Sequence, residues 1–250
     1  MSGRPSTAAA QRVAQGAVRG RKRESAEKSS RVRRLRASHS YGLVLVLIVA
    51  AFLFAAAVPD GRWGNSILVL LQCATLVCAL WTSGVTALTS HWNAVLVAAA
   101  CVAAISNLLT GGRLATGGTP LIAGLLTAAT VVVIARGVVD QGEVNKQSVR
   151  GSIGIYILLG LLFAFLYGAV AGLGSTPLFA QGTDGTRPLR VYFSFVTLTT
   201  LGYGDYSPAG TIGQSLAIVE ALTGQIYLVT VVALLVSRIG QGRNDSLSPD

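Results

Sequence analysis

The sequence predicts an all-α membrane protein with six transmembrane helices. Of its 250 residues, 52% are hydrophobic and only 12% are charged, and the mean hydropathy is +0.59. The charged fraction is about half that of an average soluble protein. Soluble enzymes, disordered chains and disulfide-rich secreted modules are therefore excluded as classes.

The net charge of +10 is concentrated in residues 1–40, which contain eleven basic and two acidic side chains. We expect this segment to be disordered and cytoplasmic. It could bind anionic lipid head groups. No nucleic acid partner is expected, because no aromatic residue precedes Tyr41. A mitochondrial transit peptide is an alternative for this Arg- and Ser-rich leader, but we favour a retained first helix in a bacterial-type plasma membrane.

Six apolar runs are near the length of about 20 residues that a membrane-spanning helix requires. They lie at 41–58, 65–83, 93–109, 119–139, 151–172 and 211–238. The first four form a peripheral group within 41–140, the last two form a module over 150–238, and residues 239–250 form a short cytoplasmic tail, too short for a folded ligand-binding domain. Because Lys and Arg favour the cytoplasmic side, an even number of spans places both termini there.

The segment between the fifth and sixth spans is unlike the other loops. A polar stretch with Gly and Pro precedes an apolar and aromatic piece at 189–199, and Pro188 suits the first turn of a helix. Eleven helical residues measure only about 16 Å. This length predicts a half-crossing re-entrant helix, which is tolerated where protein or a water-filled cavity surrounds it.

Directly after this piece stands the sequence Thr199-Thr200-Leu201-Gly202-Tyr203-Gly204-Asp205. An ion without its hydration shell needs replacement oxygens, and an extended backbone can supply a ladder of carbonyls if they are aimed one way. Glycines at alternate positions permit the required dihedral angles. Leu201 and Tyr203 can pack outward, and Thr200 adds a hydroxyl group at the inner end.

This motif resembles the Thr-Val-Gly-Tyr-Gly filter of the potassium channel family, with Leu201 in place of Val. Gly-Tyr-Gly alone also fits a surface turn, but the preceding half-helix, Asp205 and the flanking spans favour the filter. The resemblance covers roughly 150–238 and implies a homotetramer with K+ as the permeant ion. It implies a selectivity filter of Thr200, Leu201, Gly202, Tyr203 and Gly204, with K+ bound at the first four. The residues implied to support the filter are Thr199, Asp205, Tyr192 and Phe193. A gating hinge is implied at Gly224.

Two positions in the sixth span, Glu220 and Gly224, have two interpretations each. Glu220 is the only acidic residue inside an apolar span, so it is either an ion-attracting or proton-sensing group or a hydrogen-bonded side chain packed behind the half-helix. Gln225 shares a helical face with Leu228 and Val232 and would be the polar member of a cavity lining. Close helix packing is an alternative to the hinge at Gly224.

These observations predict a potassium-selective channel that conducts passively and is not an enzyme. Steep voltage gating is not expected, because the fourth span carries Arg136 alone. No cofactor is expected: the two histidines, His39 and His91, form no metal or catalytic pattern, and the three cysteines lie in apolar runs. The alternatives are a poorly selective cation channel and a non-conducting or transport-coupled membrane subunit.

Overall fold

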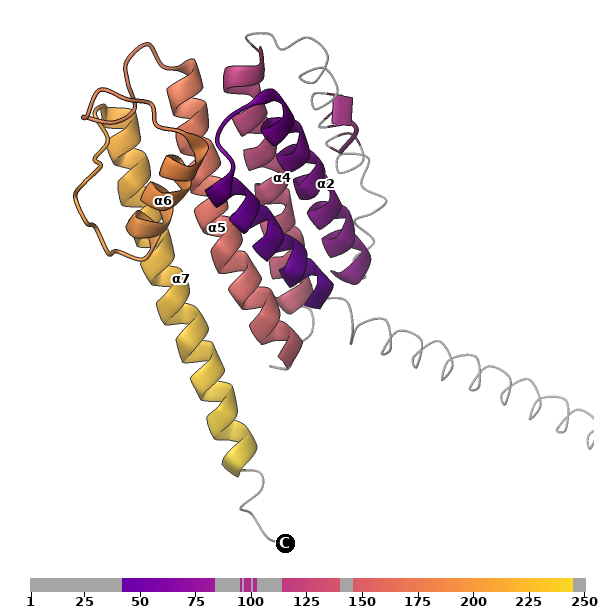
Figure 1. Ribbon diagram of the computed structural model, residues 1–250. Helices are drawn as coiled ribbons and strands as arrows, with labels where there is room; N and C mark the ends of the chain where they lie inside the picture. Colours follow the sequence, from indigo (N-terminus) through magenta and orange to yellow (C-terminus); the bar gives the residue numbers. More distant parts are fainter. Residues whose placement is uncertain are drawn as a thin grey trace, which may run out of the picture. The chain divides into compact units, whose positions relative to one another are not determined.

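The computed structural model describes residues 42–83, 95, 97–99, 101–102, 114–139 and 146–244. Within these ranges the secondary structure is helical, with only isolated β-bridges besides the helices. The helices are Gly42–Ala57, α2 (Arg62–Ser83), α4 (Leu114–Val139), α5 (Lys146–Leu173), α6 (Arg187–Leu198) and α7 (Thr211–Asn244) (Figure 1). The basic segment 1–40 and most of the predicted span at 93–109 lie outside the described residues.

Four of the described helices are long and apolar enough to cross a membrane: Arg62–Ser83, Gly118–Val139, Gln147–Leu173 and Thr211–Leu234. The apolar helix Gly42–Ala57 is shorter and measures about 24 Å. The structure is therefore that of an all-helical, multi-pass membrane protein. The total of six spans remains a prediction.

The helices extend beyond the apolar runs from which they were predicted. α4 and α5 each begin five residues before the expected starts at 119 and 151, and α7 continues past 238. Apolar length locates the part of a helix that lies in hydrocarbon, whereas backbone hydrogen bonding continues into the interfacial region. Trp63 and Trp81, at the two ends of α2, are 70% and 79% exposed, and their separation of about 27 Å matches the aromatic belts of a bilayer.

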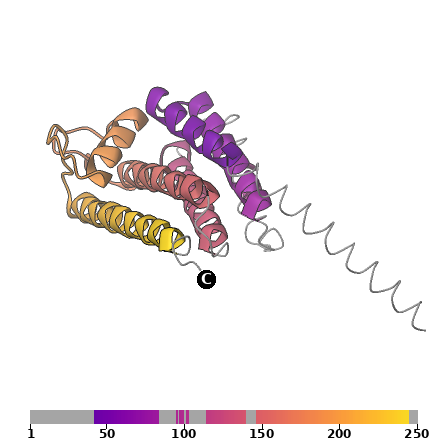
Figure 2. The same ribbon diagram turned by 90° about the horizontal axis from the view of Figure 1, so that it is seen from below.

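α5 is the central helix of the bundle. It packs against α4 on one side and against α6 and α7 on the other, as seen along the helices in Figure 2. One cluster of buried side chains joins α5 to the helices before it, and another, containing Phe163, Tyr167, Phe179 and Phe193, joins it to α6 and to the segment between α5 and α6. The rigid packing of α5 therefore positions the short helix α6.

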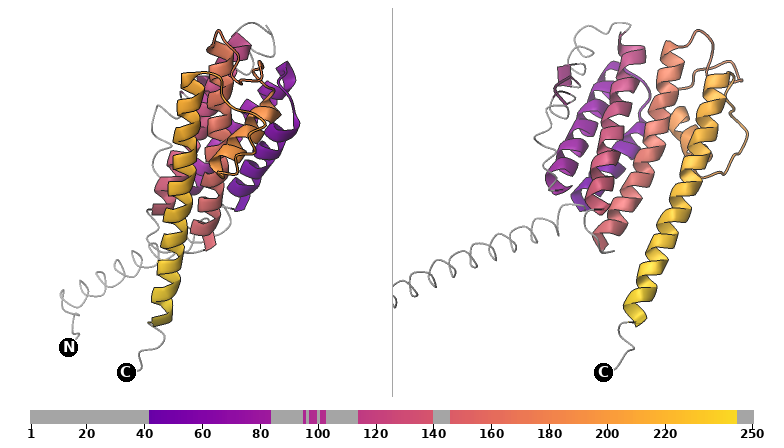
Figure 3. Two further views of the ribbon diagram at one scale, coloured as in Figure 1. Left: turned by 90° about the vertical axis from the view of Figure 1, so that its left-hand side faces the viewer. Right: turned by 180° about the vertical axis from the view of Figure 1, so that it is seen from behind.

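α7 stands at the edge of the bundle and packs only on α5 and α6 among the labelled helices (Figure 3). Only 11% of its most apolar stretch is buried. Large apolar side chains are exposed along it, namely Ile212, Ile218, Val219, Leu222, Ile226, Val229, Val232 and Leu234. A face of this size needs lipid or protein to cover it.

Candidate functional site

The candidate site is the loop of residues 199–208, which directly follows α6; we call it the Gly-Tyr-Gly loop. α6 has 12 residues, with Pro188 in its first turn, so it measures about 18 Å and cannot span a bilayer. Its C-terminus carries a partial negative charge next to the loop. The predicted half-helix at 189–199 thus corresponds to a helix that begins two residues earlier and ends one residue earlier.

Three alternate residues of the loop have left-handed backbone conformations. The φ angles are 57° at Thr200, 56° at Gly202 and 79° at Gly204, whereas the φ angles of Leu201 and Tyr203 are not positive. In a regular strand successive carbonyls point to opposite sides. When every second residue has a positive φ instead of a negative one, the carbonyls all turn to the same side. Thr200 is the one described non-glycine residue with a positive φ, which is unusual for a β-branched residue.

The inner end of the loop is anchored to the C-terminus of α6. The backbone N–H groups of Leu201 and Gly202 donate to the carbonyl of Val196 at 2.9 and 3.3 Å. The Thr200 hydroxyl donates to the carbonyl of Thr199 at 2.7 Å and accepts from Gln225 Nε2 at 2.9 Å. Gln225, predicted from its helical face, therefore contacts the first residue of the motif.

The other end of the loop is held by Tyr192 and by Gln181, a residue that the sequence alone does not single out. The Tyr192 hydroxyl donates to Asp205 Oδ2 at 2.8 Å, and its ring stacks on Tyr203 with centroids 6.4 Å apart. Gln181 uses both ends of its carboxamide: Nε2 donates to the Asp205 carbonyl at 2.9 Å and Oε1 accepts from the Ser207 N–H at 3.5 Å. Nothing in the polar stretch around Gln181 distinguishes it before the loop is folded.

The other predicted support residues have different surroundings. Phe193 lies in the aromatic cluster against which Tyr206 packs, where its ring lies edge-on to Tyr167 and Phe179 at 5.1 and 5.2 Å. The Thr199 hydroxyl donates to the Phe195 carbonyl of its own helix at 2.7 Å. Gly224 lies against the end of α6, because a Cβ there would be 2.2 Å from the Leu198 carbonyl oxygen. Glu220 is fully buried behind α6, away from the loop.

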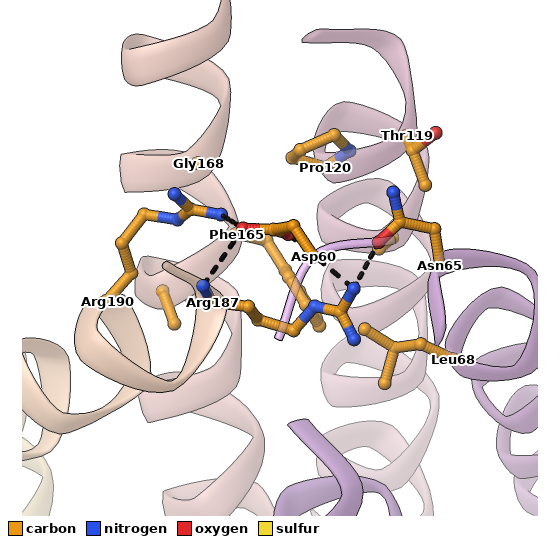
Figure 4. Close-up of a pocket in the computed structure, with 11 residues that line it drawn as sticks. Asp60, Asn65, Leu68, Thr119, Pro120, Phe165, Gly168, Arg187 and Arg190 are labelled. Atoms are coloured by element: carbon orange, nitrogen blue, oxygen red, sulfur yellow. Dashed lines mark hydrogen bonds and ion pairs between the residues drawn. The ribbon is translucent and has the colours of Figure 1, made fainter. Parts of the chain in front are cut away.

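The start of α6 is fixed by a group of residues that the sequence did not reveal, here called the arginine cluster: Asp60, Asn65, Arg187 and Arg190. Asp60 accepts from Arg190 Nη2 at 2.7 Å and from the Arg187 backbone N–H at 3.0 Å. Arg187 also donates to Asn65 of α2. Figure 4 shows Asp60 between the two arginine side chains. The only sequence signal was an acidic residue after the first helix and two arginines three apart.

Burial lowers the pKa of Arg187, although Asp60 opposes this effect. The two guanidinium-bearing side chains are 5% and 9% exposed, whereas that of Asp60 is 42% exposed. Thr186 at the N-cap of α6 makes no side-chain capping bond. The carboxylate of Asp60 takes over this role from another segment, where the helix dipole favours a negative charge.

Comparison with known proteins agrees with this geometry. Residues 155–241, about a third of the chain, match the family model described as "Ion channel". The chain is 32% identical over 91 residues to the voltage-gated potassium channel KCNC4 of Rattus norvegicus, over 34% of this chain and 15% of that protein. It is 31% identical over 85 residues to the inward rectifier potassium channel Kirbac3.1 of Paramagnetospirillum magnetotacticum, over 34% of this chain and 27% of that protein.

The matched stretch contains α6 and the Gly-Tyr-Gly loop, with most of α5 and of α7. This stretch is similar to an ion-channel domain and to potassium channels. The chain spans well under a third of the length of these curated relatives.

Proposed function

We propose that the protein is a potassium-selective channel that conducts K+ passively across a membrane through a homotetrameric pore. The observation that carries this proposal is the positive φ angle at every second residue, namely Thr200, Gly202 and Gly204. These residues directly follow a helix that is too short to span a bilayer. Such a backbone offers a ladder of carbonyl oxygens, which is what a dehydrated K+ ion requires. The K+ ligands proposed are Thr200, Leu201, Gly202 and Tyr203, with Gly204 completing the filter.

A single chain supplies one strand, and a ring of carbonyls needs several. Leu201 and Tyr203 are 56% and 66% exposed, and α7, which packs on α5 and α6, leaves large apolar side chains uncovered. Covering these surfaces with further copies of the chain is consistent with a tetramer around the loop. In this arrangement α6 is re-entrant, and its C-terminal end favours a cation below the loop.

The proposal includes a plasma-membrane location with both termini cytoplasmic. It also includes the absence of steep voltage gating. Moving one charge through the membrane field contributes about 2.3 kcal/mol per 100 mV, and Arg136 is the only basic residue of α4. Several charges would be needed for steep gating.

The test is the reversal potential of the purified protein in planar bilayers with K+ on one side and Na+ on the other. A reversal near the K+ equilibrium potential supports the proposal. A reversal near zero supports a poorly selective cation channel instead. An absence of flux in liposomes at both polarities, from protein shown to be a folded tetramer, supports the non-conducting or transport-coupled subunit.

Gly202→Asp is expected to abolish K+-selective current. Gly202 has a φ of 56° that L-residues rarely adopt, so a side chain there would strain the backbone whose carbonyls are the proposed K+ ligands. Gly182→Asp is the matched control, because Gly182 also has a positive φ, 76°, and open space around it, but lies in the outer loop. We expect Gly182→Asp to retain the reversal potential of the wild type. Equal loss in both variants would contradict the assignment of the loop as the filter.

Tyr192→Phe is expected to lower K+ current about fivefold, because the variant loses the hydrogen bond to Asp205. The bond to Asp205 raises the pKa of the Tyr192 hydroxyl, so the bond is present at neutral pH and is lost as pH rises through that raised pKa. Tyr206→Phe is the control, since Tyr206 packs on Phe179 and its hydroxyl has no hydrogen-bond partner among the described residues. Steady-state current at neutral pH measures both; an unchanged Tyr192→Phe current would remove this support role.

A further inference from the structure

Glu220 of α7 has a carboxyl group enclosed between α5 and α6. Its side chain is 0% exposed. Oε2 accepts a hydrogen bond from the Tyr167 hydroxyl of α5 at 2.7 Å, and Oε1 lies within hydrogen-bond distance of Ser194 Oγ of α6. The carboxyl group therefore joins three helices at one point, about halfway along α6.

The hydroxyl of Ser194 has two oxygen neighbours and one proton. Besides Glu220 Oε1, it lies 2.7 Å from the carbonyl oxygen of Gly160 in α5. A carbonyl only accepts, and an ionised carboxylate only accepts. If Glu220 were ionised, both groups would compete for the single Ser194 proton, and one contact between buried oxygens would have no hydrogen.

A proton on Glu220 resolves this competition. The carboxylic acid then donates from Oε1 to Ser194 Oγ, Ser194 donates to Gly160, and Tyr167 still donates to Oε2. Every oxygen contact in the junction then has one hydrogen. Tyr167 and Gly160 both belong to α5, two turns apart, so the chain of hydrogen bonds starts and ends on that helix.

The surroundings also favour the neutral acid. From α5, the titratable side chain in contact with Glu220 is Tyr167; from α6, the contacting side chain is Ser194, which does not titrate. The cationic residues of α6, Arg187 and Arg190, are bound to Asp60. A buried carboxylate without a cationic partner is strongly disfavoured in a membrane.

We propose that Glu220 is a protonated carboxylic acid that donates a hydrogen bond to Ser194 and thereby positions α6 and the Gly-Tyr-Gly loop for conduction. The role rests on the proposed channel function, whereas the protonation state does not. Gly160 allows the junction to form, since a Cβ there would be 2.5 Å from the Phe195 ring of α6. Glu220 is thus a positioning residue and does not contact the permeant ion.

Glu220→Gln and Glu220→Leu separate a hydrogen-bond donor from a negative charge. Glutamine retains a donor for Ser194 and an acceptor for Tyr167, so we expect its K+ flux in liposomes to stay within about twofold of the wild type. Leucine leaves Tyr167 without an acceptor, so we expect a loss of about fivefold or more. Equal losses in both variants would overturn the proposal, because they would show that the charge is required.

Tyr167→Phe and Tyr227→Phe form a second pair that is independent of any change at Glu220. Tyr227 donates to the Ser152 carbonyl at 2.7 Å and joins α7 to α5 without contacting α6. We expect Tyr167→Phe to lower open probability in single-channel records about fivefold, and Tyr227→Phe to leave it unchanged. The same effect in both variants would reduce Glu220 to a general packing contact and overturn its positioning role.

Infrared spectroscopy tests the protonation state directly, with or without channel activity. The difference spectrum between the wild type and Glu220→Gln should contain the carbonyl stretch of a protonated carboxylic acid at neutral pH. Carboxylate bands in its place would overturn the proposal. If the wild type passes no ions, the proposed channel function and the positioning role are both wrong. The spectrum still determines the protonation state of Glu220 in that case.

Discussion

Replacing Asp60 by alanine is expected to lower the free energy of unfolding by about 2 to 3 kcal/mol. Removing one partner of a fully buried ion pair lowers the free energy of unfolding by more than this. Asp60 is 42% exposed, however, and solvent reduces the effect. The variant leaves the buried guanidinium groups of Arg187 and Arg190 without their carboxylate and removes the cap of α6. Arg187 Nη1 already has no hydrogen-bond partner among the described residues, so the site has no spare acceptor for it.

Thermal unfolding of the detergent-solubilised protein, followed by tryptophan fluorescence, measures this loss. A decrease in Tm of about 5 to 10 °C is expected for a chain of this size. Asp184→Ala is the control, because Asp184 is also an acidic residue of the outer loops but caps only the Leu178 N–H, at 2.9 Å. A decrease no larger than that of Asp184→Ala would show that Asp60 acts only through surface charge.

The apolar helices could be predicted from the sequence because each carries its own signal. The expected spans at 65–83, 119–139, 151–172 and 211–238 each correspond to a described helix that is long and apolar enough to cross a membrane. The short helix α6 could be predicted from its length and from Pro188. These features depend on neighbouring residues alone, so a single sequence contains them.

The contacts that Gln181 makes with the Gly-Tyr-Gly loop, and Asp60 with the start of α6, could not be predicted in the same way. Gln181 reaches Asp205 across 24 residues, and Asp60 reaches Arg190 across 130. Such pairs become visible only when the path of the chain is known. Phe193 shows the related difficulty on one helix: Tyr192 contacts Asp205 and Tyr203 of the loop, whereas the neighbouring Phe193 packs against Tyr167 and Phe179.

Glu220 and Gly224 show what a single sequence leaves open. Each had two interpretations that depended on which way α7 faces. Glu220 proves to be packed behind α6, with its carboxyl group hydrogen-bonded. The close approach of α7 to Leu198 gives Gly224 a packing role that needs no bending of the helix, and the hinge remains a prediction.

Gly224→Ala is expected to abolish conduction and to reduce the yield of folded protein. The new Cβ would lie 2.2 Å from the carbonyl oxygen of Leu198 and 3.1 Å from its carbonyl carbon. Leu198 is fully buried and is the last residue of α6. The backbone must therefore move by about 1 Å to reach van der Waals distance, and this displacement passes directly into Thr199 and Thr200.

K+ flux in liposomes and size-exclusion chromatography measure the two effects. Gly118→Ala in α4 is the control, because a Cβ there has open space within 4 Å and alanine is favoured over glycine in a helix. A hinge role alone predicts a different outcome: Gly224→Ala would then fold with wild-type yield and stability and would change only the opening of the channel.

Gly160 differs from Gly224 in the kind of atom that a Cβ would meet, which is a side-chain atom at Gly160 and a backbone atom at Gly224. A Cβ at Gly160 would meet the Phe195 ring at 2.5 Å, so Gly160→Ala should be rescued, at least in folded yield, by Phe195→Leu. No truncation of Leu198 can rescue Gly224→Ala, since every residue at 198 keeps the same carbonyl oxygen. Rescue of Gly224→Ala by Leu198→Ala would show that the side chain, and not the backbone, sets the separation of α6 and α7.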